Sequence, residues 1–354
     1  AQAAVAALGV EYEPLPAVFN AEQAMAPGAP LLHEQTGPTG PSAGGYSRYL
    51  RVWRPIPGTN ICNYLRLTKG DMEQGLAQAD YVFDDTFRCP MVHHCYTEPH
   101  ATIASFDAQG KLTIWTGTQA PFRMRAELAH ALGLPEEQVR IISPKVGGGF
   151  GGKSRPLLEH LAALLSQRTG RPVKMVLSRE EEFTTSAGSL PVSIRLRTGV
   201  KRDGTLTARH VTLVWDTGAY GDGLITSWHA RHSSPGPYRI PNVRVDDYLV
   251  YTNKMPTTAF RSLGLHQIAW ACESQMDIIA DRLDIDPVEL RLRNILKEGD
   301  VSHTGEVLDG VNLRECLLRT AQAIGWADRK RLPHNHGMGI ACFHKPSSPG
   351  TESR

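Results

Sequence analysis

A glycine-rich loop, Gly147–Lys153, is the segment of this sequence best suited to hold a ligand against bare backbone. Five of its first six residues are glycines, and glycine lets the main chain approach a ligand closely and adopt positive φ angles. An apolar run, Val139–Ile142, precedes the loop, and a helical pattern, Leu157–Leu165, follows it. Because backbone amides ahead of a helix attract anions, the segment predicts a site for a phosphate or another oxygen-rich group.

Two known phosphate-binding patterns fit this loop. Residues Gly147–Ser154 satisfy G-x-x-x-x-G-K-[ST], the phosphate loop of nucleotide hydrolases, and Asp216, which closes an apolar strand, could serve as the metal aspartate. Gly147, Gly149 and Gly152 also satisfy the dinucleotide pattern G-x-G-x-x-G. Since a run of glycines meets both patterns easily, a nucleotide hydrolase and a purely structural turn both stay open on this segment alone.

A second group of residues has the side chains of a metal site: His93, His94, Cys95, Glu98 and His100. Along a strand, alternate side chains point to opposite faces, so these five cannot all converge. We therefore interpret the segment as packing and expect no metal held by protein side chains. Three further charged positions are read as structural: Lys153 as the neutraliser of a buried carboxylate or cofactor phosphate, Glu180–Glu182 as a solvated face, and Arg291 as part of a helix start.

Composition narrows the class of protein. The 354 residues carry 38 Lys and Arg against 36 Asp and Glu, with no dense basic block, which disfavours nucleic-acid binding. No apolar run approaches the roughly 20 residues of a membrane span. The six cysteines are scattered and form no C-x-x-C pair, which argues against a zinc or iron–sulfur site in this chain and suits free thiols in the cytoplasm.

The elements around the loop predict an α+β fold with mixed sheets and packed helices. A hairpin is expected over 189–200 and 205–215, about the Asp203-Gly204 turn. A meander is expected from strands at 81–88, 101–106 and 111–116. Helices are expected at 121–132, before Gly133, and through Ile268–Ile279; strict β-α-β alternation is missing.

Three parts are predicted along the chain. Residues 1–60 are read as the end of a preceding domain, with a short strand at 10–16, followed by a Gly- and Pro-rich linker. Residues 61–300 form the main domain, in which 216–237 is a loop. Residues 301–354 carry a helix and a strand, 337–343, that lead into a further part.

Four segments taken together resemble the molybdenum-binding subunit of the xanthine dehydrogenase family, the molybdenum hydroxylases. They are Thr118-Gln119, Gly147–Lys153, Thr258–Arg261 and Leu290–Asn294, in the same order and with matching spacing over nearly the whole chain. The resemblance is far more specific than either glycine motif, and it favours a molybdopterin site over a nucleotide site.

The resemblance implies roles for particular residues. Gln119 would hydrogen-bond an oxygen ligand of molybdenum, and Arg261 would donate its planar guanidinium to the cofactor region. Gly149, Phe150 and Gly151 would present bare backbone, with amides directed at the apical oxygen. In bacterial members the pterin carries a cytosine dinucleotide, so molybdopterin cytosine dinucleotide is the expected cofactor.

The family's reaction implies partners as well. Its members hydroxylate an electron-poor carbon with water as the oxygen source, and electrons leave through 2Fe-2S clusters to FAD on other subunits. The family's catalytic glutamate lies in a second half that this chain does not contain. The chain is therefore expected to act with a second molybdopterin-binding segment or chain, in a split arrangement similar to that of some nicotinate dehydrogenases.

Three positions bear on the substrate. By resemblance, Ser154 replaces the acidic residue of purine-oxidising members, His229 their purine-orienting arginine, and Leu263 their ring-stacking phenylalanine. These changes disfavour xanthine and leave N-heterocyclic acids, aldehydes and aromatic thioesters open. The carbon monoxide branch is disfavoured because Ser262-Leu263-Gly264 lacks its cysteine. The two alternative functions are a nucleotide hydrolase and a non-catalytic scaffold of the same fold.

Overall fold

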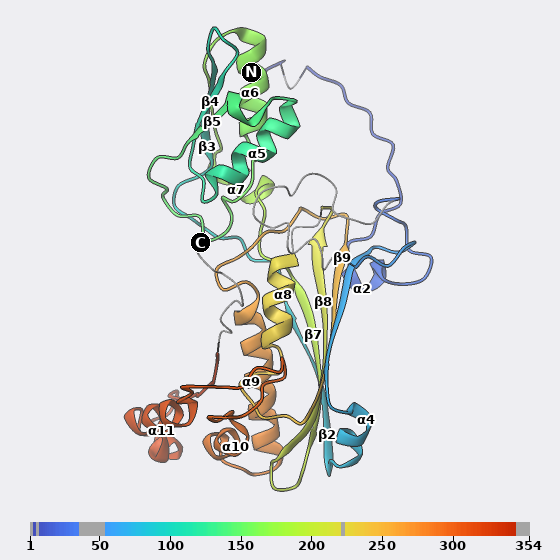
Figure 1. Ribbon diagram of the computed structural model, residues 1–354, viewed down its shortest axis with the longest axis vertical. Helices are drawn as coiled ribbons and strands as arrows, with labels where there is room; N and C mark the ends of the chain where they lie inside the picture. Colours follow the sequence, from blue (N-terminus) through green and yellow to red (C-terminus); the bar gives the residue numbers. More distant parts are fainter. Residues whose placement is uncertain (1–2, 5–6, 35–53, 221–223, 345–354) are drawn as a thin grey trace.

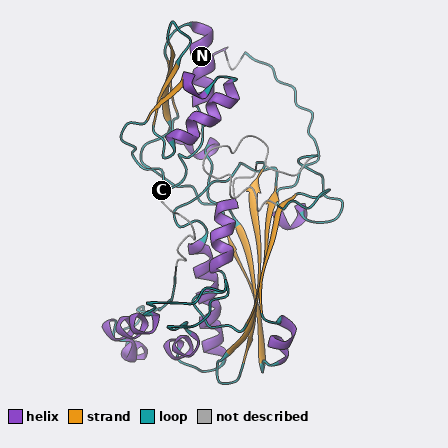
Figure 2. Cartoon of the chain, viewed as in Figure 1, coloured by secondary structure: helices purple, strands orange, loops and turns teal. Residues whose placement is uncertain are grey.

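The computed structural model describes residues 3–4, 7–34, 54–220 and 224–344. The molecule is elongated and contains two sheets, one in its upper body and one in its lower body (Figure 1). Helices pack on both sheets and strands run in both directions (Figure 2), so the predicted α+β class is confirmed.

The larger sheet has five strands in the order β1-β9-β8-β7-β2. Only the β8–β9 pair is parallel within it. The strands are β1 (Ile61–Lys69), β2 (Tyr81–Cys89), β7 (Val192–Val200), β8 (Leu206–Gly218) and β9 (Asn242–Tyr251). The predicted hairpin is confirmed, since β7 and β8 pair antiparallel and Gly204 takes φ +86° in their turn.

Two long helices cover one face of this sheet. They are α8 (Leu224–Ser233) and α9 (Leu265–Arg282), and Figure 1 shows them on the side opposite α2 (Ala21–Ala24) and α4 (Met72–Ala77). Ile268, Ala271, Met276 and Ile279 on α9 are buried in the same apolar cluster as Trp215 of β8. The expected helical stripe therefore forms the main core, although Ile278, placed on the same side, is 37% exposed.

The smaller sheet has four strands in the order β5-β4-β3-β6. They are β3 (Ala101–Phe106), β4 (Leu112–Thr116), β5 (Val139–Ile142) and β6 (Val173–Val176), packed by α5 (Pro121–Leu132) and α6 (Glu159–Thr169). The predicted meander is wrong at its first strand, because β2 pairs with β7 in the other sheet. Alternating residues identify a strand but not its partner, and the stretch 90–100 carries the chain from one sheet to the other.

Two other predictions about elements need correction. Residues 216–237, expected as a loop, contain helix α8, whose Thr226 and Ala230 side chains pack against Gly264. Residues 10–16 and 337–343, expected as strands, have no regular secondary structure. The described residues also contain the α-helices α7 (Arg179–Thr185), α10 (Pro287–Asn294) and α11 (Leu313–Ala323) and the 3-10 helices η1 (Glu136–Gln138) and η2 (Trp326–Arg331).

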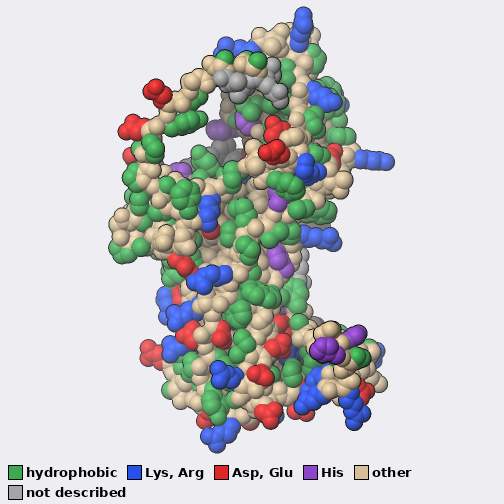
Figure 3. All heavy atoms as spheres, turned by 180° about the vertical axis from the view of Figure 1, so that it is seen from behind, with side chains coloured by type: hydrophobic (Ala, Val, Ile, Leu, Met, Phe, Trp, Pro, Cys, Tyr) green, Lys and Arg blue, Asp and Glu red, His purple; other side chains and the backbone are tan. Residues whose placement is uncertain are grey.

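The surface carries charges of both signs. On the face seen in Figure 3, acidic and basic side chains are interspersed over the lower body. Among the described residues, no helix is long and apolar enough to cross a membrane. The domain boundaries expected at residues 60 and 300 stay predictions. The part predicted for residues 301–354 contains its expected helix, α11, but the segment 337–343 does not form the expected strand.

Candidate functional site

The glycine loop adopts a conformation that side chains would prevent. Gly148, Phe150 and Gly151 have φ angles of +97°, +51° and +111°, and the Gly152 amide donates to the Gly149 carbonyl at 2.7 Å. A Cβ on Gly151 would collide with the carbonyl oxygen of Ala259. The loop therefore depends on glycine both for its backbone angles and for its close approach to a neighbouring segment.

One carboxylate fastens both ends of the loop. Glu98 Oε2 accepts hydrogen bonds from the Gly147 amide at 2.8 Å and from Lys153 Nζ at 2.7 Å. The Lys153 side chain is 1% exposed, and its Nζ lies 4.7 Å from the Tyr96 ring centroid. Burial would raise the pKa of Glu98, but Lys153 and the Gly147 amide hold it below its usual value. Of the two expected partners of Lys153, a buried carboxylate and a cofactor phosphate, the structure shows a carboxylate, although Glu98 is 36% exposed rather than buried.

The phosphate-loop interpretation does not survive this geometry. The Lys153 ammonium is already paired to Glu98, and the following helix begins only at Glu159. Asp216, considered as a magnesium ligand, accepts instead from Thr252 and from Lys254 Nζ, the latter at 2.9 Å. Neither the lysine nor the aspartate is placed to bind a nucleotide and its metal.

Gln119 is locked against the glycine loop. Its backbone amide donates to the Lys153 carbonyl at 2.9 Å, and its Oε1 accepts from the Gly151 amide at 2.9 Å. Because Oε1 must face the Gly151 amide, the NH2 group of the Gln119 carboxamide is left as an outward donor. The described residues offer this NH2 no acceptor.

The arginine loop meets the glycine loop directly. The Arg261 amide donates to the Phe150 carbonyl at 2.8 Å, while His94 Nε2 lies 2.9 Å from the Ala259 carbonyl oxygen. Ser262 and Leu263 both take positive φ angles, +85° and +52°. No described residue forms an ion pair with the exposed Arg261 guanidinium. The structure thus brings together the loops of Gln119, Phe150 and Arg261.

The three predicted substrate positions have different environments. Ser154 Oγ donates to the Gly151 carbonyl at 2.7 Å, so this hydroxyl braces the glycine loop. Leu263 is half-buried next to Gly264, which packs against side chains of α8. His229 is only 4% exposed and lies on α8 beside Trp228, which corrects its placement in a loop. Ser154 therefore belongs to the glycine loop itself, whereas His229 belongs to a helix that adjoins the arginine loop.

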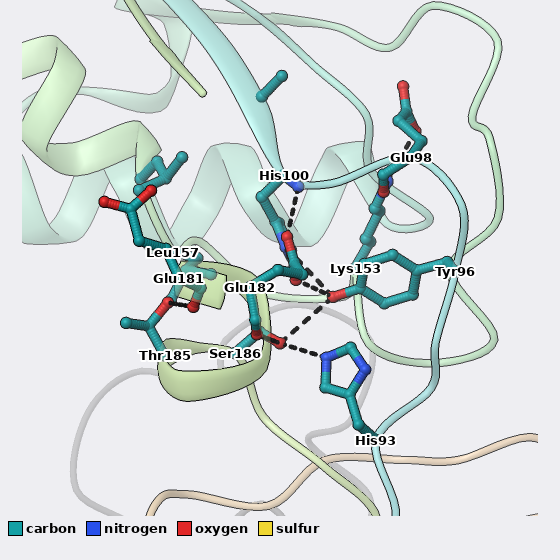
Figure 4. A network of polar contacts seen from close by, with 12 residues as sticks. His93, Tyr96, Glu98, His100, Lys153, Leu157, Glu181, Glu182, Thr185 and Ser186 are labelled. Carbon is teal, nitrogen blue, oxygen red and sulfur yellow. Dashed lines mark hydrogen bonds and ion pairs between the residues drawn. The ribbon is translucent and has the colours of Figure 1, made fainter. Parts of the chain in front are cut away.

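The sequence-based predictions did not include a buried polar network that lies beside the glycine loop. Figure 4 shows hydrogen bonds meeting at the Tyr96 hydroxyl, which donates to Glu182 Oε1 at 2.5 Å. Glu182 also accepts from the His100 amide at 2.6 Å and lies 2.8 Å from His100 Nδ1. Burial alone would raise the pKa of Glu182, but the bonds from Tyr96 and His100 lower it to about 2.

This network corrects the interpretation of the acidic run as a solvated face at one residue, Glu182. Glu182 is fully buried, whereas Glu180 is exposed and Glu181 completes a capping box with Ser178 at the start of α7. Helical spacing could have indicated this difference between the three carboxylates. A glutamate at the third helical position, here Glu181, is expected to cap the helix, and the next residue, Glu182, then points inward. Arg291, read as structural, is fully buried and pairs with Glu273 at 2.9 Å.

The fold is shared with solved oxidoreductases. The aldehyde oxidoreductase of Desulfovibrio gigas and the quinoline 2-oxidoreductase of Pseudomonas putida 86 each match with a TM-score of 0.80 and 26% sequence identity. The similarity covers 93% of this chain and 34% and 40% of theirs. The architecture is thus that of the molybdenum-binding part of a molybdenum hydroxylase.

The chain belongs to the molybdopterin cofactor-binding domain family, whose model matches residues 55–295. It is 37% identical over 320 residues to the nicotinate dehydrogenase large molybdopterin subunit of Eubacterium barkeri, covering 89% of this chain and 69% of that protein. It is 33% identical to a probable xanthine dehydrogenase subunit of Bacillus subtilis, covering 96% of this chain and 45% of the relative. The resemblance inferred from the loops is confirmed, and the chain spans less than half of the second relative.

Proposed function

We propose that this chain forms one half of the catalytic unit of a molybdenum hydroxylase, and that the Gln119, glycine and arginine loops hold its molybdopterin. The observation that carries the proposal is the direct contact between these loops, through Gln119 Oε1 with the Gly151 amide and the Arg261 amide with the Phe150 carbonyl. Membership of the molybdopterin cofactor-binding family supports it.

The residues fit such a group chemically. A pterin that carries its own metal through sulfur needs no metal-ligating side chain, but its oxygen atoms and phosphate need donors. Gln119 offers an outward NH2, Arg261 an exposed guanidinium, and the loop a stretch of backbone in which a Cβ on Gly149 would strike the Gln119 carboxamide. These are neutral and cationic donors on a surface without intervening side chains.

When bound, the cofactor supplies the two-electron redox chemistry that hydroxylates an electron-poor carbon with oxygen from water. The chain's own part is to bind and orient. Gln119 donates one hydrogen bond from a carboxamide fixed by the loop, and Arg261 adds a delocalised positive charge. The ring of Phe150, which is 43% exposed, lies beside Gly148 of the same loop.

The finer identity of the cofactor and of its partners extends this proposal. We expect the cytosine dinucleotide form of molybdopterin, a second segment or chain that supplies the catalytic glutamate, and 2Fe-2S and FAD centres on other subunits. The six free cysteines suit the reducing cytoplasm. The substrate is expected to be an N-heterocycle or an aldehyde, with N-heterocyclic acids and aromatic thioesters among the open classes, because Ser154 and Leu263 offer neither a carboxylate nor an aromatic ring for a purine.

Metal analysis of the native assembly tests the proposal. We expect about one molybdenum per chain and a pterin released on denaturation, with the cytosine nucleotide identified by mass spectrometry. Tight binding of ATP and Mg²⁺ by the chain, abolished by Lys153→Ala, would instead support a nucleotide hydrolase. Absence of molybdenum, pterin and nucleotide from a fully assembled preparation would leave the scaffold alternative.

A further inference from the structure

The smaller sheet of the upper body has helices packed on one face, whereas its other face exposes apolar side chains. Figure 1 shows α5 and α6 on the same side of this sheet. Met124 of α5 and Ala162 of α6 are buried in one apolar cluster with Ile114 of β4. Because side chains along a strand alternate between its two faces, the residues on either side of Ile114 point away from these helices. We call the face on which they lie the open face.

An apolar row crosses the open face from strand to strand. Ile103 of β3 is paired with Trp115 of β4, and Trp115 is paired with Ile142 of β5. Val176 of β6 is paired with Ala101 of β3 and points to the same face as Ile103. Ile103 is 37% exposed, Trp115 40% and Val176 53%. Outward positions of a sheet that faces water are usually polar, so this row predicts a surface that another protein covers.

Two cations border the apolar row. Lys174 of β6 is paired with Ile103. Arg140 of β5 is paired with Thr113, which neighbours Trp115 on this face, and both cations are exposed. Within the described strands β3–β6, no acidic residue occupies a position on the open face. The face is therefore apolar at its centre and positive at its border, which favours a partner with an apolar contact surface and carboxylates around it.

The open face adjoins the loops that are proposed to hold the cofactor. Strand β4 leads from Trp115 into the Gln119 loop, and β5 leads from Ile142 into the glycine loop. At the ends of the two strands, Ser143 Oγ donates a hydrogen bond to the Thr118 carbonyl at 3.0 Å. A partner that covers the exposed Gln119 would therefore have Trp115 and Ile142 within reach.

We propose that the open face is the docking surface for the second molybdopterin-binding segment or chain, and that carboxylates of this second segment face Lys174 and Arg140. The inference rests on the proposed function, which assigns the other half of the site to that segment. This chain covers 45% of the length of its Bacillus subtilis relative, so the rest of such a relative is long enough to supply a covering layer. An apolar contact across neighbouring strands is typical of a permanent interface rather than of a transient electron-transfer contact.

Oxidative footprinting with hydroxyl radicals tests whether the open face is covered. Trp115 and Trp270 are matched reporters, because they are 40% and 49% exposed and lie on the smaller sheet and on α9. In the complete native assembly, compared with the chain alone, we expect Trp115 to lose most of its labelling and Trp270 to keep it. Unchanged labelling of Trp115 would overturn the docking surface but not the proposed function. An assembly without a second segment and without molybdenum would overturn both.

A zero-length carbodiimide cross-link in the same assembly identifies the occupant. The reagent joins an amine to a carboxylate that it contacts, so Lys174 should become linked to an aspartate or glutamate of the second segment. Linkage of Lys174 to an iron–sulfur or flavin subunit instead would overturn the occupant and leave the proposed function standing. Absence of any linkage at Lys174 would overturn the proposed charge pairing.

Variants then assign the contact to this face. Ile103→Glu places a charge in the apolar row, so it should restore the labelling of Trp115 and weaken retention of the second segment at least about tenfold. Ile278→Glu is the matched control, because Ile278 is also 37% exposed but lies on α9, and it should leave Trp115 protected. If Ile103→Glu does not fold by circular dichroism, Lys174→Glu serves in its place and should weaken retention at least about threefold. Equal protection of Trp115 in the two isoleucine variants would contradict the proposal.

Discussion

At the scale of single residues, the site is built on donors fixed by the backbone. The Gln119 carboxamide is oriented by the Gly151 amide at 2.9 Å, so its NH2 cannot turn away from a ligand without breaking that bond. Such a donor costs little reorganisation when charge develops beside it, which is the physical basis of electrostatic stabilisation in active sites.

Replacing Gln119 by glutamate isolates this donor. The carboxylate introduced by Gln119→Glu would be isosteric and would still accept from the Gly151 amide, but it would offer no N–H, so turnover should fall by about 10²-fold with the fold intact. Gln119→Ala and Arg261→Ala should lower turnover as well. Steady-state kinetics and circular dichroism check this, and unchanged kinetics in both alanine variants would contradict the assigned positions.

Glu182 makes stability depend on acidity. Its pKa, usually near 4.5, is lowered to about 2 in the folded chain, so the folded state favours the ionised form. The resulting stabilisation, up to roughly 3 kcal/mol, is fully present above about pH 4.5 and is lost as the pH falls towards about 2. Urea unfolding at pH 7 and pH 3 should show a smaller difference for Glu182→Gln than for the wild type. An equal difference would rule out this residue as the source.

At the scale of elements, the glycine loop is held by contacts that tolerate no side chain at one position. The Phe150 carbonyl bonds the Arg261 amide at 2.8 Å, and the neighbouring Gly151 faces the Ala259 carbonyl without room for a Cβ. The Glu98 carboxylate ties the two ends of the loop together. The loop therefore acts as a shaped backbone surface rather than as a flexible connection.

Gly151→Ala tests this surface, with Gly110→Ala as its matched control. Both glycines have positive φ, +111° and +79°, but nothing lies within 4 Å of a Cβ on Gly110. Both variants should lose about 1–2 kcal/mol from backbone strain. Only Gly151→Ala should also separate the two loops and reduce the molybdenum content. Equal molybdenum content in the two variants would show that the contact with Ala259 is unimportant.

The sequence predicted the β7–β8 hairpin and helix α9 better than it predicted helix α8. The β7–β8 hairpin and helix α9 follow from local signals, a tight turn at Asp203-Gly204 and apolar residues at helical spacing. Helix α8 was missed because its burial depends on distant partners, including the bond from Ser227 to Asp247 at 2.6 Å. Likewise, helical spacing can place Glu182 on the inner side of its helix, but it cannot identify Tyr96 and His100 as its partners, because both lie more than 80 residues away in the sequence.

At the scale of the whole molecule, the candidate site lies where the two bodies meet. The glycine loop connects β5 to α6 in the upper body, while the arginine loop precedes α9 in the lower body (Figure 1). The bonds between the loops are thus also contacts between the bodies. A cofactor held here would stabilise their arrangement by its binding free energy.

The last prediction concerns the second half of the site, which we propose that another segment or chain provides. Gln119 and Arg261 are exposed, and Phe150 is 43% exposed, so a cofactor bound to these loops alone would keep one side in solvent. This chain covers 45% of the length of its Bacillus subtilis relative. The chain produced alone should therefore retain far less molybdenum than the chain produced together with a segment that corresponds to the rest of that relative. Metal analysis after gel filtration measures the difference, and Arg261→Ala in the complete assembly controls for contacts made by this chain. Stoichiometric molybdenum on the chain alone would contradict the proposed second half, because the hydrogen bonds of Gln119, Arg261 and the loop amides would then be enough to hold the cofactor.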